Sequence, residues 1–182
     1  KDDEVIVPAF PQPPALSICY IGATPVFVDI EESSLCIDPQ RVKDAITEKT
    51  KAIIIIHTHN TMSNMDEIIE ISKKYKIPVI EDCCHAHGMK WKDIGAGYLG
   101  DIGVFSFESS KVMTCGEGGM ITTNSKKNFD SLVAIKNMGN DSSGKNRGDI
   151  LGWNFRMSEF HAAVLLAQLN RFSKQVEKKY KN

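Results

Sequence analysis

The sequence predicts an α/β fold with a mainly parallel sheet, and two observations lead to that class. Short apolar segments that are typical of buried strands alternate with helix-like segments along the whole chain. Residues 53–56 form an unbroken apolar run, as a parallel strand does when both faces of its sheet are covered. The 182 residues, 42% hydrophobic and 25% charged, suffice for one sizeable core. We find no internal repeat and expect no domain boundary within the chain.

Strands are expected at residues 5–7, 26–29, 53–56, 77–80, 102–107 and 120–123. Helices are expected at residues 15–21, 40–47, 63–74, 126–136 and 158–169, with an exposed helical end after residue 173. Asp38 before Pro39 predicts an N-cap followed by proline at the first helical position. Ser63 with Asp66 three residues later resembles a capping box, and Gly22 is suited to end the first helix. A polar loop is expected at residues 139–148.

The composition excludes several classes of function. A formal net charge of -1 provides no basic field, so neither nucleic acid nor an anionic membrane is an expected partner. No run approaches membrane-spanning length, and no signal peptide opens the chain. Five cysteines without framework spacing indicate free thiols in a reducing cytoplasm. Because the chain begins without Met and directly enters a strand-like segment, we expect an excerpt of a longer protein.

The stretch at residues 101–119 is the most informative about function. A predicted strand there contains Ser106 and is followed by Lys111 and a glycine-rich loop. An ammonium group away from water is costly unless it has a partner or a task. Desolvation also favours the neutral amine that attacks carbonyl groups. Taken alone, the stretch is equally consistent with a solvated Lys111 in a surface turn. P-loop glycine spacing is absent, and an S-x-x-K motif would need Ser where Glu108 stands.

Polar clusters follow three predicted strands, and ligands collect at the carboxyl ends of strands in such sheets. Two clusters contain His-x-His pairs, His57 with His59 and His85 with His87, near carboxylates and thiols. These four histidines are one possible zinc site, which would suit a hydrolase. The metal-hydrolase pattern H-x-H-x-D-H, however, needs Asp and His where this chain has Thr and Met. In the alternative interpretation, which we favour, the histidines satisfy buried backbone groups.

The same clusters offer a carboxylate, a lysine, and small hydroxyl and amide donors. Pyridoxal 5'-phosphate (PLP) needs this combination of groups. A lysine forms the Schiff base, an acidic side chain keeps the pyridine nitrogen protonated, and hydrogen-bond donors hold the phosphate.

Several motifs occur in a fixed order along the chain. They are Glu81-Asp82, His87-Gly88, Gly100-Asp101, Phe105-Ser106-Phe107, Lys111, Gly116-Glu117-Gly118-Gly119, Leu151-Gly152-Trp153-Asn154-Phe155-Arg156-Met157-Ser158 and Ala162-Ala163. Together they closely resemble the DegT/DnrJ/EryC1/StrS family of PLP-dependent aminotransferases, which act on keto sugars and cyclitols. Residues 3–9 and 22–29 match as well, so the resemblance spans essentially the whole chain.

The resemblance implies a role for each matching residue. Lys111 resembles the Schiff-base lysine, which also moves the proton between the donor's Cα and the cofactor's C4′ atom. Asp82 resembles the partner of the pyridine nitrogen, and Ser106 a phosphate contact. Asn154 resembles the residue that reaches the phosphate in the neighbouring subunit, which implies a homodimer with shared sites. His85 stands where the family commonly has Gln near the cofactor's phenolic oxygen.

Two departures from the family pattern stand out. The family usually has an aromatic residue that stacks on the pyridine ring in the segment after residues 8–9. Here Pro11-Gln12-Pro13-Pro14 stands there and is one residue short, which leaves Phe10 as the candidate. The family's N-terminal Gly-Thr phosphate-binding segment and its smaller C-terminal domain are also absent. We therefore expect residues 1–182 to be part of a PLP-binding large domain of fold type I, with three α/β/α layers.

The resemblance implies a cytoplasmic aminotransferase that moves an amino group from glutamate or glutamine to a keto sugar, often nucleotide-linked, or to a keto cyclitol. Such enzymes serve amino-sugar, polysaccharide or secondary-metabolite biosynthesis. Residues 57–66 are more similar to the aminocyclitol and aminohydroxybenzoate branch than to the sugar-nucleotide branch. The related sugar dehydratases have His in place of the lysine, so Lys111 disfavours that activity. The zinc hydrolase and a non-catalytic relative are the alternatives.

Overall fold

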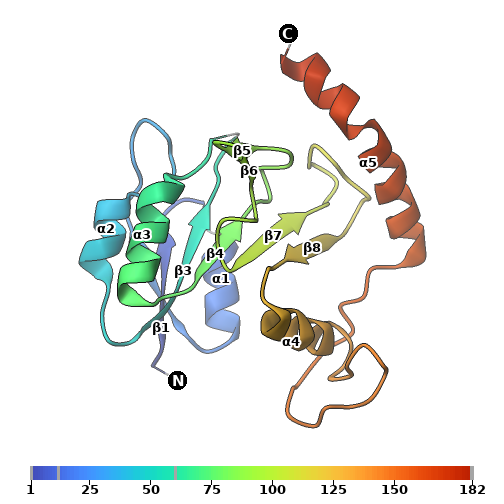
Figure 1. The fold of residues 1–182 in the computed structure, drawn as a ribbon, viewed down its shortest axis with the longest axis horizontal. Helices are drawn as coiled ribbons and strands as arrows, with labels where there is room; N and C mark the ends of the chain where they lie inside the picture. The colour runs from blue at the N-terminus through green and yellow to red at the C-terminus, as the bar shows by residue number, and fades with distance from the viewer. Residues whose placement is uncertain (1, 12, 60, 181–182) are drawn as a thin grey trace. The chain divides into compact units, whose positions relative to one another are not determined.

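The computed structural model describes residues 2–11, 13–59 and 61–180 (Figure 1). Its strands are β1 (Glu4–Pro8), β2 (Thr24–Val28), β3 (Thr50–Ile56), β4 (Val79–Asp82), β5 (Lys90–Trp91), β6 (Ile94–Gly95), β7 (Ile102–Ser106) and β8 (Gly119–Thr122). Its helices are α1 (Pro13–Tyr20), α2 (Pro39–Ala45), α3 (Met65–Tyr75), α4 (Lys126–Lys136) and α5 (Glu159–Tyr180). Strands and helices alternate as the sequence predicts from β1 to β4, whereas β4 to β8 follow one another without a helix between them.

The main sheet has the strand order β2-β1-β3-β4-β7-β8. Strand β1 pairs in parallel with β2 and β3, and the pairs β3–β4 and β4–β7 are parallel too. The prediction of a mainly parallel sheet is therefore confirmed. Strands β5 and β6 form a separate antiparallel pair that the sequence analysis did not predict, because each has only two residues. The strand expected at residues 77–80 lies two residues later, so that Asp82 is its last residue.

The chain divides into two compact units. The first consists of Lys1–Ser106 and Met120–Thr122, and it holds nearly the whole sheet. The second consists of Phe107–Gly119 and Thr123–Asn182, and it contains α4 and α5. Each unit is described by itself.

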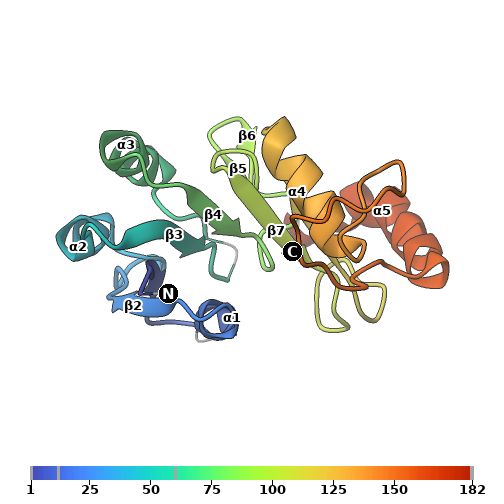
Figure 2. The ribbon, with the colours of Figure 1, turned by 90° about the horizontal axis from the view of Figure 1, so that it is seen from below.

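Helices cover both faces of the sheet in the first unit, which gives the predicted three layers (Figure 2). The side chains of Ile53 and Ile55 belong to a core cluster with Met65 and Ile68 of α3. Between them, Ile54 points to the opposite face and joins the cluster that includes residues of α1. Alternate residues of a strand face opposite sides, so a strand covered twice must be apolar throughout. Each such isoleucine contributes about 1.5–3 kcal/mol relative to an exposed one.

Helix α3 begins one residue later than the capping pattern predicts. Asn64, not Ser63, is the N-cap, and its side-chain oxygen accepts the backbone N–H of Glu67. Ser63 is buried instead, and its hydroxyl donates to the carbonyl of Ile56 at 3.1 Å. Both residue types are good caps, so the sequence does not distinguish these neighbours. The start of α2 agrees with the prediction, since Asp38 accepts the backbone N–H groups of the first turn.

Helix α5 of the second unit is longer than predicted. It runs without interruption over 22 residues to Tyr180, whereas a helix to residue 169 and a separate helical end were expected. The hydroxyl of Ser158 accepts the backbone N–H of His161 at 3.3 Å, which confirms the expected cap. Within the described ranges, every helix is too short or too polar to cross a bilayer.

We expect Asn64→Ala to lower the free energy of unfolding by about 1 kcal/mol, because the substitution removes the side-chain oxygen that caps α3. Urea unfolding followed by circular dichroism measures the change. Asn64→Ser is the control and should retain most of the stability, because serine also caps helices. Equal losses in the two variants would show that the cap is not what stabilises this helix start.

Candidate functional site

The carboxyl ends of β3, β4 and β7 gather three of the predicted site residues at one edge of the first unit. Ile56 at the end of β3 is paired with Asp82, and Asp82 is paired with Val104 of β7. Ser106 is the last residue of β7, and His85 lies in the turn that follows β4. Because these strands are parallel, their polar ends lie at the same edge of the sheet.

Asp82 occupies a fixed position at this edge. Its carboxylate accepts the backbone N–H of Cys84 at 3.0 Å, and its own carbonyl accepts the backbone N–H of His57 at 3.1 Å. The side chain is half-buried. A carboxylate tied in this way has a defined direction, as a partner for a ring nitrogen requires.

Aromatic rings stack at the same edge, an arrangement that the sequence analysis missed. The imidazoles of His59 and His85 are stacked, with centroids 5.6 Å apart and planes 17° apart. The ring of Phe10 lies 6.3 Å from that of His59. His59 also has a positive φ of 47°, which is uncommon for a residue with a side chain. Gln12, and Asn60 within the segment at residues 57–66, lie outside the described residues.

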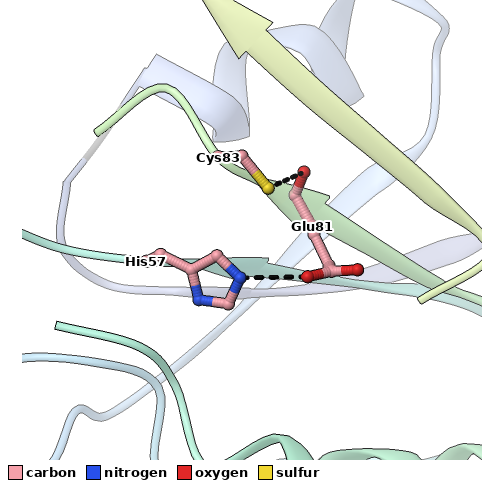
Figure 3. Close-up of side chains that lie close together, drawn as sticks. All are labelled: His57, Glu81 and Cys83. Atoms are coloured by element: carbon pink, nitrogen blue, oxygen red, sulfur yellow. Dashed lines mark hydrogen bonds and ion pairs between the residues drawn. The ribbon is translucent and has the colours of Figure 1, made fainter. Parts of the chain in front are cut away.

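A buried carboxylate lies directly behind this edge (Figure 3). The side chain of Glu81 is fully buried, and it accepts four hydrogen bonds. The donors are Nε2 of His57 at 3.1 Å and the backbone N–H groups of Gly97 at 3.0 Å, Leu99 at 2.8 Å and Gly100 at 2.6 Å. Two carboxylate oxygens offer about four acceptor positions, so each acceptor position of Glu81 is occupied by a donor.

The hydrogen bonds of His57 assign its protonation state. The backbone N–H of Ser63 donates to Nδ1 at 3.2 Å, so Nδ1 must be an unprotonated acceptor. Nε2 then carries the proton that it donates to Glu81. His57 is thus a neutral imidazole that bridges two buried groups. One of them is a backbone N–H, so the prediction that the histidines satisfy buried backbone groups holds for His57.

The electrostatics of Glu81 and Cys83 follow from the same surroundings. Burial alone would raise the pKa of Glu81, but the hydrogen bonds from His57, Gly100 and Gly97 outweigh it and hold this pKa below its usual range. Burial, with the negative charges of Glu81 and Asp82, strongly raises the pKa of the Cys83 thiol. Cys83 therefore remains protonated at neutral pH.

Zinc does not fit this cluster. Among the described residues, the only group of three or more potential metal ligands that lie close together is His57, Glu81 and Cys83, so the four histidines do not form a common ligand set. Both nitrogens of His57 and all acceptor positions of Glu81 are occupied by protein groups. A metal would also need the thiolate of Cys83 rather than the thiol.

Lys111 belongs to the second unit and is half-buried in a turn. Its backbone N–H donates to the carbonyl of Glu108 at 3.0 Å. The chain is anchored just before the turn, because the N–H of the buried Phe107 donates to Gly118 at 2.8 Å. The surface-turn interpretation was thus right about the local shape but wrong about full exposure.

Asn154 lies in an exposed segment of the second unit and forms an antiparallel bridge with Asn137. Nε of Arg156 lies 2.9 Å from its side-chain oxygen. A guanidinium only donates hydrogen bonds, so the amide oxygen must face Arg156. The NH₂ group is therefore on the other side of the amide, where it is a donor.

We expect Glu81→Gln to lower the free energy of unfolding by about 3 kcal/mol, because a glutamine amide places an NH₂ group against N–H donors. Urea unfolding at pH 7 measures the loss. The exposed Glu70 on α3 provides the matched control, and Glu70→Gln should change stability by less than about 0.5 kcal/mol. Similar values for the two variants would contradict the central role of the buried carboxylate.

The stability difference between wild type and Glu81→Gln should shrink on acidification. The pKa of Glu81 is lowered in the folded state, so its stabilisation is complete above the unfolded-state pKa of about 4.3 and is lost as the pH falls toward the folded value. Unfolding free energies measured between pH 7 and pH 3 test this dependence. A difference that stays constant down to pH 3 would show that the ionised form contributes nothing.

The comparisons with known proteins agree with this geometry. The sequence profile of the DegT/DnrJ/EryC1/StrS aminotransferase family matches residues 1–182. L-glutamine:scyllo-inosose aminotransferase from Streptomyces griseus is 37% identical, over 92% of this chain and 42% of that protein. The crystal structure of 3-amino-5-hydroxybenzoic acid synthase is 34% identical, with a TM-score of 0.89 over 96% of this chain and 47% of that one.

A dehydratase structure also matches. GDP-4-keto-6-deoxy-D-mannose-3-dehydratase from E. coli, with bound hydrated PLP, is 28% identical, with a TM-score of 0.89 over 100% of this chain and 51% of that one. These likenesses confirm the predicted fold type I class. The chain spans 41% to 50% of the length of the curated relatives that it matches. It belongs to the DegT/DnrJ/EryC1/StrS aminotransferase family.

Proposed function

We propose that this chain is the cofactor-binding part of a PLP-dependent aminotransferase, which moves an amino group from glutamate or glutamine to a keto cyclitol. The observation that carries the proposal is the match of the whole chain to the aminotransferase family, with Lys111 and Asp82 both in place. Lys111 also separates the proposed activity from that of the sugar dehydratases.

The chemistry of the donor set fits PLP. At the sheet edge of the first unit, the fixed carboxylate of Asp82 suits a protonated pyridine nitrogen. His85 and Ser106, at the same edge, supply an imidazole for the phenolic oxygen and a hydroxyl for the phosphate. The second unit contains the two remaining candidates, Lys111 with its amine and Asn154 with its amide NH₂ group.

The residues of the chain divide the work between binding and proton transfer. Bound PLP supplies an electron sink that allows the Cα–H bond of the amino donor to break. Asp82 would keep the ring nitrogen protonated. Lys111 would hold the cofactor through Nζ, and its amine would serve as the acid and base for the proton at the donor's Cα. The stacked His59 ring restricts the rotation of the His85 imidazole, which would contact the phenolic oxygen of the cofactor.

The homodimer and the location of the enzyme belong to the same proposal. Asn154 is exposed, with its amide NH₂ oriented by Arg156, which suits a contact with the phosphate in a neighbouring subunit. All five cysteines are free, as is usual in a reducing cytoplasm.

A cyclitol-type acceptor has the stronger support. Two of the matched relatives are named for scyllo-inosose and for 3-amino-5-hydroxybenzoic acid, both six-membered carbocycles. A nucleotide-linked keto sugar is the second candidate, because the matched dehydratase is named for a GDP-linked keto sugar.

Borohydride trapping tests the proposal. Incubation of the intact gene product with PLP, followed by reduction and peptide mapping, should place a pyridoxyl group on Lys111. Lys111→Ala should abolish the label, while Lys73→Ala on the exposed face of α3 should not. Asp82→Asn should keep the label but lower the transamination rate roughly 100-fold.

Two results would contradict the proposal. A folded wild-type protein that never carries the label at Lys111 is not a PLP-dependent aminotransferase. A labelled protein that converts no PLP to pyridoxamine phosphate with any amino donor is a non-catalytic relative.

A further inference from the structure

We propose that Glu108 is a positioning residue for Lys111, because its carboxylate holds together the turn from which the lysine side chain extends. The inference rests on the proposed function, since it assumes that Lys111 reacts with PLP. It concerns only residues of the second unit.

The turn at residues 108–111 is closed twice. On the main chain, the N–H of Lys111 donates to the carbonyl of Glu108 at 3.0 Å. On the side-chain level, Oε1 of Glu108 accepts the hydroxyl of Ser109 and the N–H of Ser110, the latter at 3.1 Å. Oε2 accepts the hydroxyl of Ser110 at 2.5 Å. One carboxylate thus binds both residues that separate it from the lysine.

The anchor of the turn lies on its N-terminal side. Phe107 is buried, and its carbonyl accepts the N–H of Cys115 at 3.0 Å and the hydroxyl of Thr114 at 3.1 Å. Ser109 and Ser110, by contrast, are exposed, so packing contributes little to their conformation. The hydrogen bonds to Glu108 are therefore what fixes the backbone between the buried Phe107 and the Cα atom of Lys111.

The charge of Glu108 is suited to this task. The hydroxyls of Ser109 and Ser110 and the N–H of Ser110 lower the pKa of Glu108 to about 2, with a smaller contribution from the charge of Lys111. The carboxylate stays ionised throughout the neutral range, and it accepts hydrogen bonds without exchanging protons. Glu108 is thus a fixed acceptor and not a second acid or base beside Lys111.

Two substitutions of Glu108 distinguish a role of its hydrogen bonds from a role of its negative charge. Glutamine keeps a carbonyl oxygen at the position of Oε1, which accepts two of the three bonds. Its NH₂ group can donate to the Ser110 hydroxyl, since hydroxyls also accept. Glu108→Gln should therefore retain the turn without the charge, whereas Glu108→Ala loses all three bonds.

The experiment measures the rate at which Lys111 binds PLP covalently, a condensation that releases one water molecule. PLP is mixed with the cofactor-free intact gene product, and the change in absorbance is followed over time. We expect the rate constant to fall about tenfold in Glu108→Ala and to stay within about threefold of wild type in Glu108→Gln. In steady-state transamination, Glu108→Ala should lower kcat roughly 10- to 100-fold and leave KM within about twofold, because misplacement of a reacting group affects the chemical step.

Ser109→Ala/Ser110→Ala provides a second test that keeps the charge. It removes the two hydroxyl donors but keeps the backbone N–H of Ser110, so it should lower the rate less than Glu108→Ala does. Combining all three substitutions should lower the rate no further than Glu108→Ala alone, because the serine hydroxyls act only through Glu108. Glu177→Ala on the exposed side of α5 removes an equal charge and should behave as wild type. If Glu108→Ala does not fold, as judged by circular dichroism, the serine variant carries the test alone.

The outcomes separate this inference from the proposed function. Wild-type protein that never captures PLP at Lys111 overturns both. Wild-type capture with equally fast capture by Glu108→Ala or by the serine variant overturns the positioning role only. Equal losses in the alanine and glutamine variants also overturn it, because they would show that the charge matters and not the turn.

Discussion

The buried carboxylate of Glu81, surrounded by four N–H donors, is the constraint on which the sheet edge depends. Its oxygens bind both His57, the residue that follows β3, and the segment at residues 97–100 that leads into β7. The carboxylate thereby connects β3, β4 and the segment that precedes β7. A buried charge is tolerated only where hydrogen bonds replace water, and here the backbone supplies most of them. The arrangement stabilises the edge only as a complete set, since any donor left without its acceptor would be buried unsatisfied.

Adjacent residues of β4 serve two different purposes at this point. Successive side chains of a strand face opposite sides of the sheet. Glu81 therefore points into the buried cluster, while Asp82 is half-buried and bonded to Cys84. Because Asp82 follows Glu81 directly in β4, the hydrogen bonds that fix Glu81 also restrain the backbone at Asp82. In the second unit, the bonds of Glu108 have a comparable effect on the turn before Lys111.

The sequence predicts the fold class well, because the pattern of residues 53–56 reflects a physical requirement of a twice-covered strand. Helix α4 was predicted with its observed ends, Lys126 and Lys136. The N-cap of α3 was misplaced by one residue, because Ser63 and Asn64 are both good caps and only tertiary contacts select between them. The zinc alternative rested on His57, His59, His85 and His87. In the structure, His57 is hydrogen-bonded to the backbone N–H of Ser63 and to Glu81, contacts that the sequence pattern does not indicate. The stacking of His59 on His85 joins residues 26 positions apart, and no local pattern indicates it.

The protonated state of Cys83 has a consequence for chemical selectivity. Aldehydes react with thiolates as well as with amines, and a thiolate next to Asp82 would compete for an electrophile that approaches this edge. Burial and the neighbouring carboxylates keep the Cys83 sulfur in its poorly nucleophilic thiol form. Burial and the carboxylates of Glu81 and Asp82 thus suppress the reactivity of the adjacent sulfur, which in the proposed function would leave Lys111 as the nucleophile.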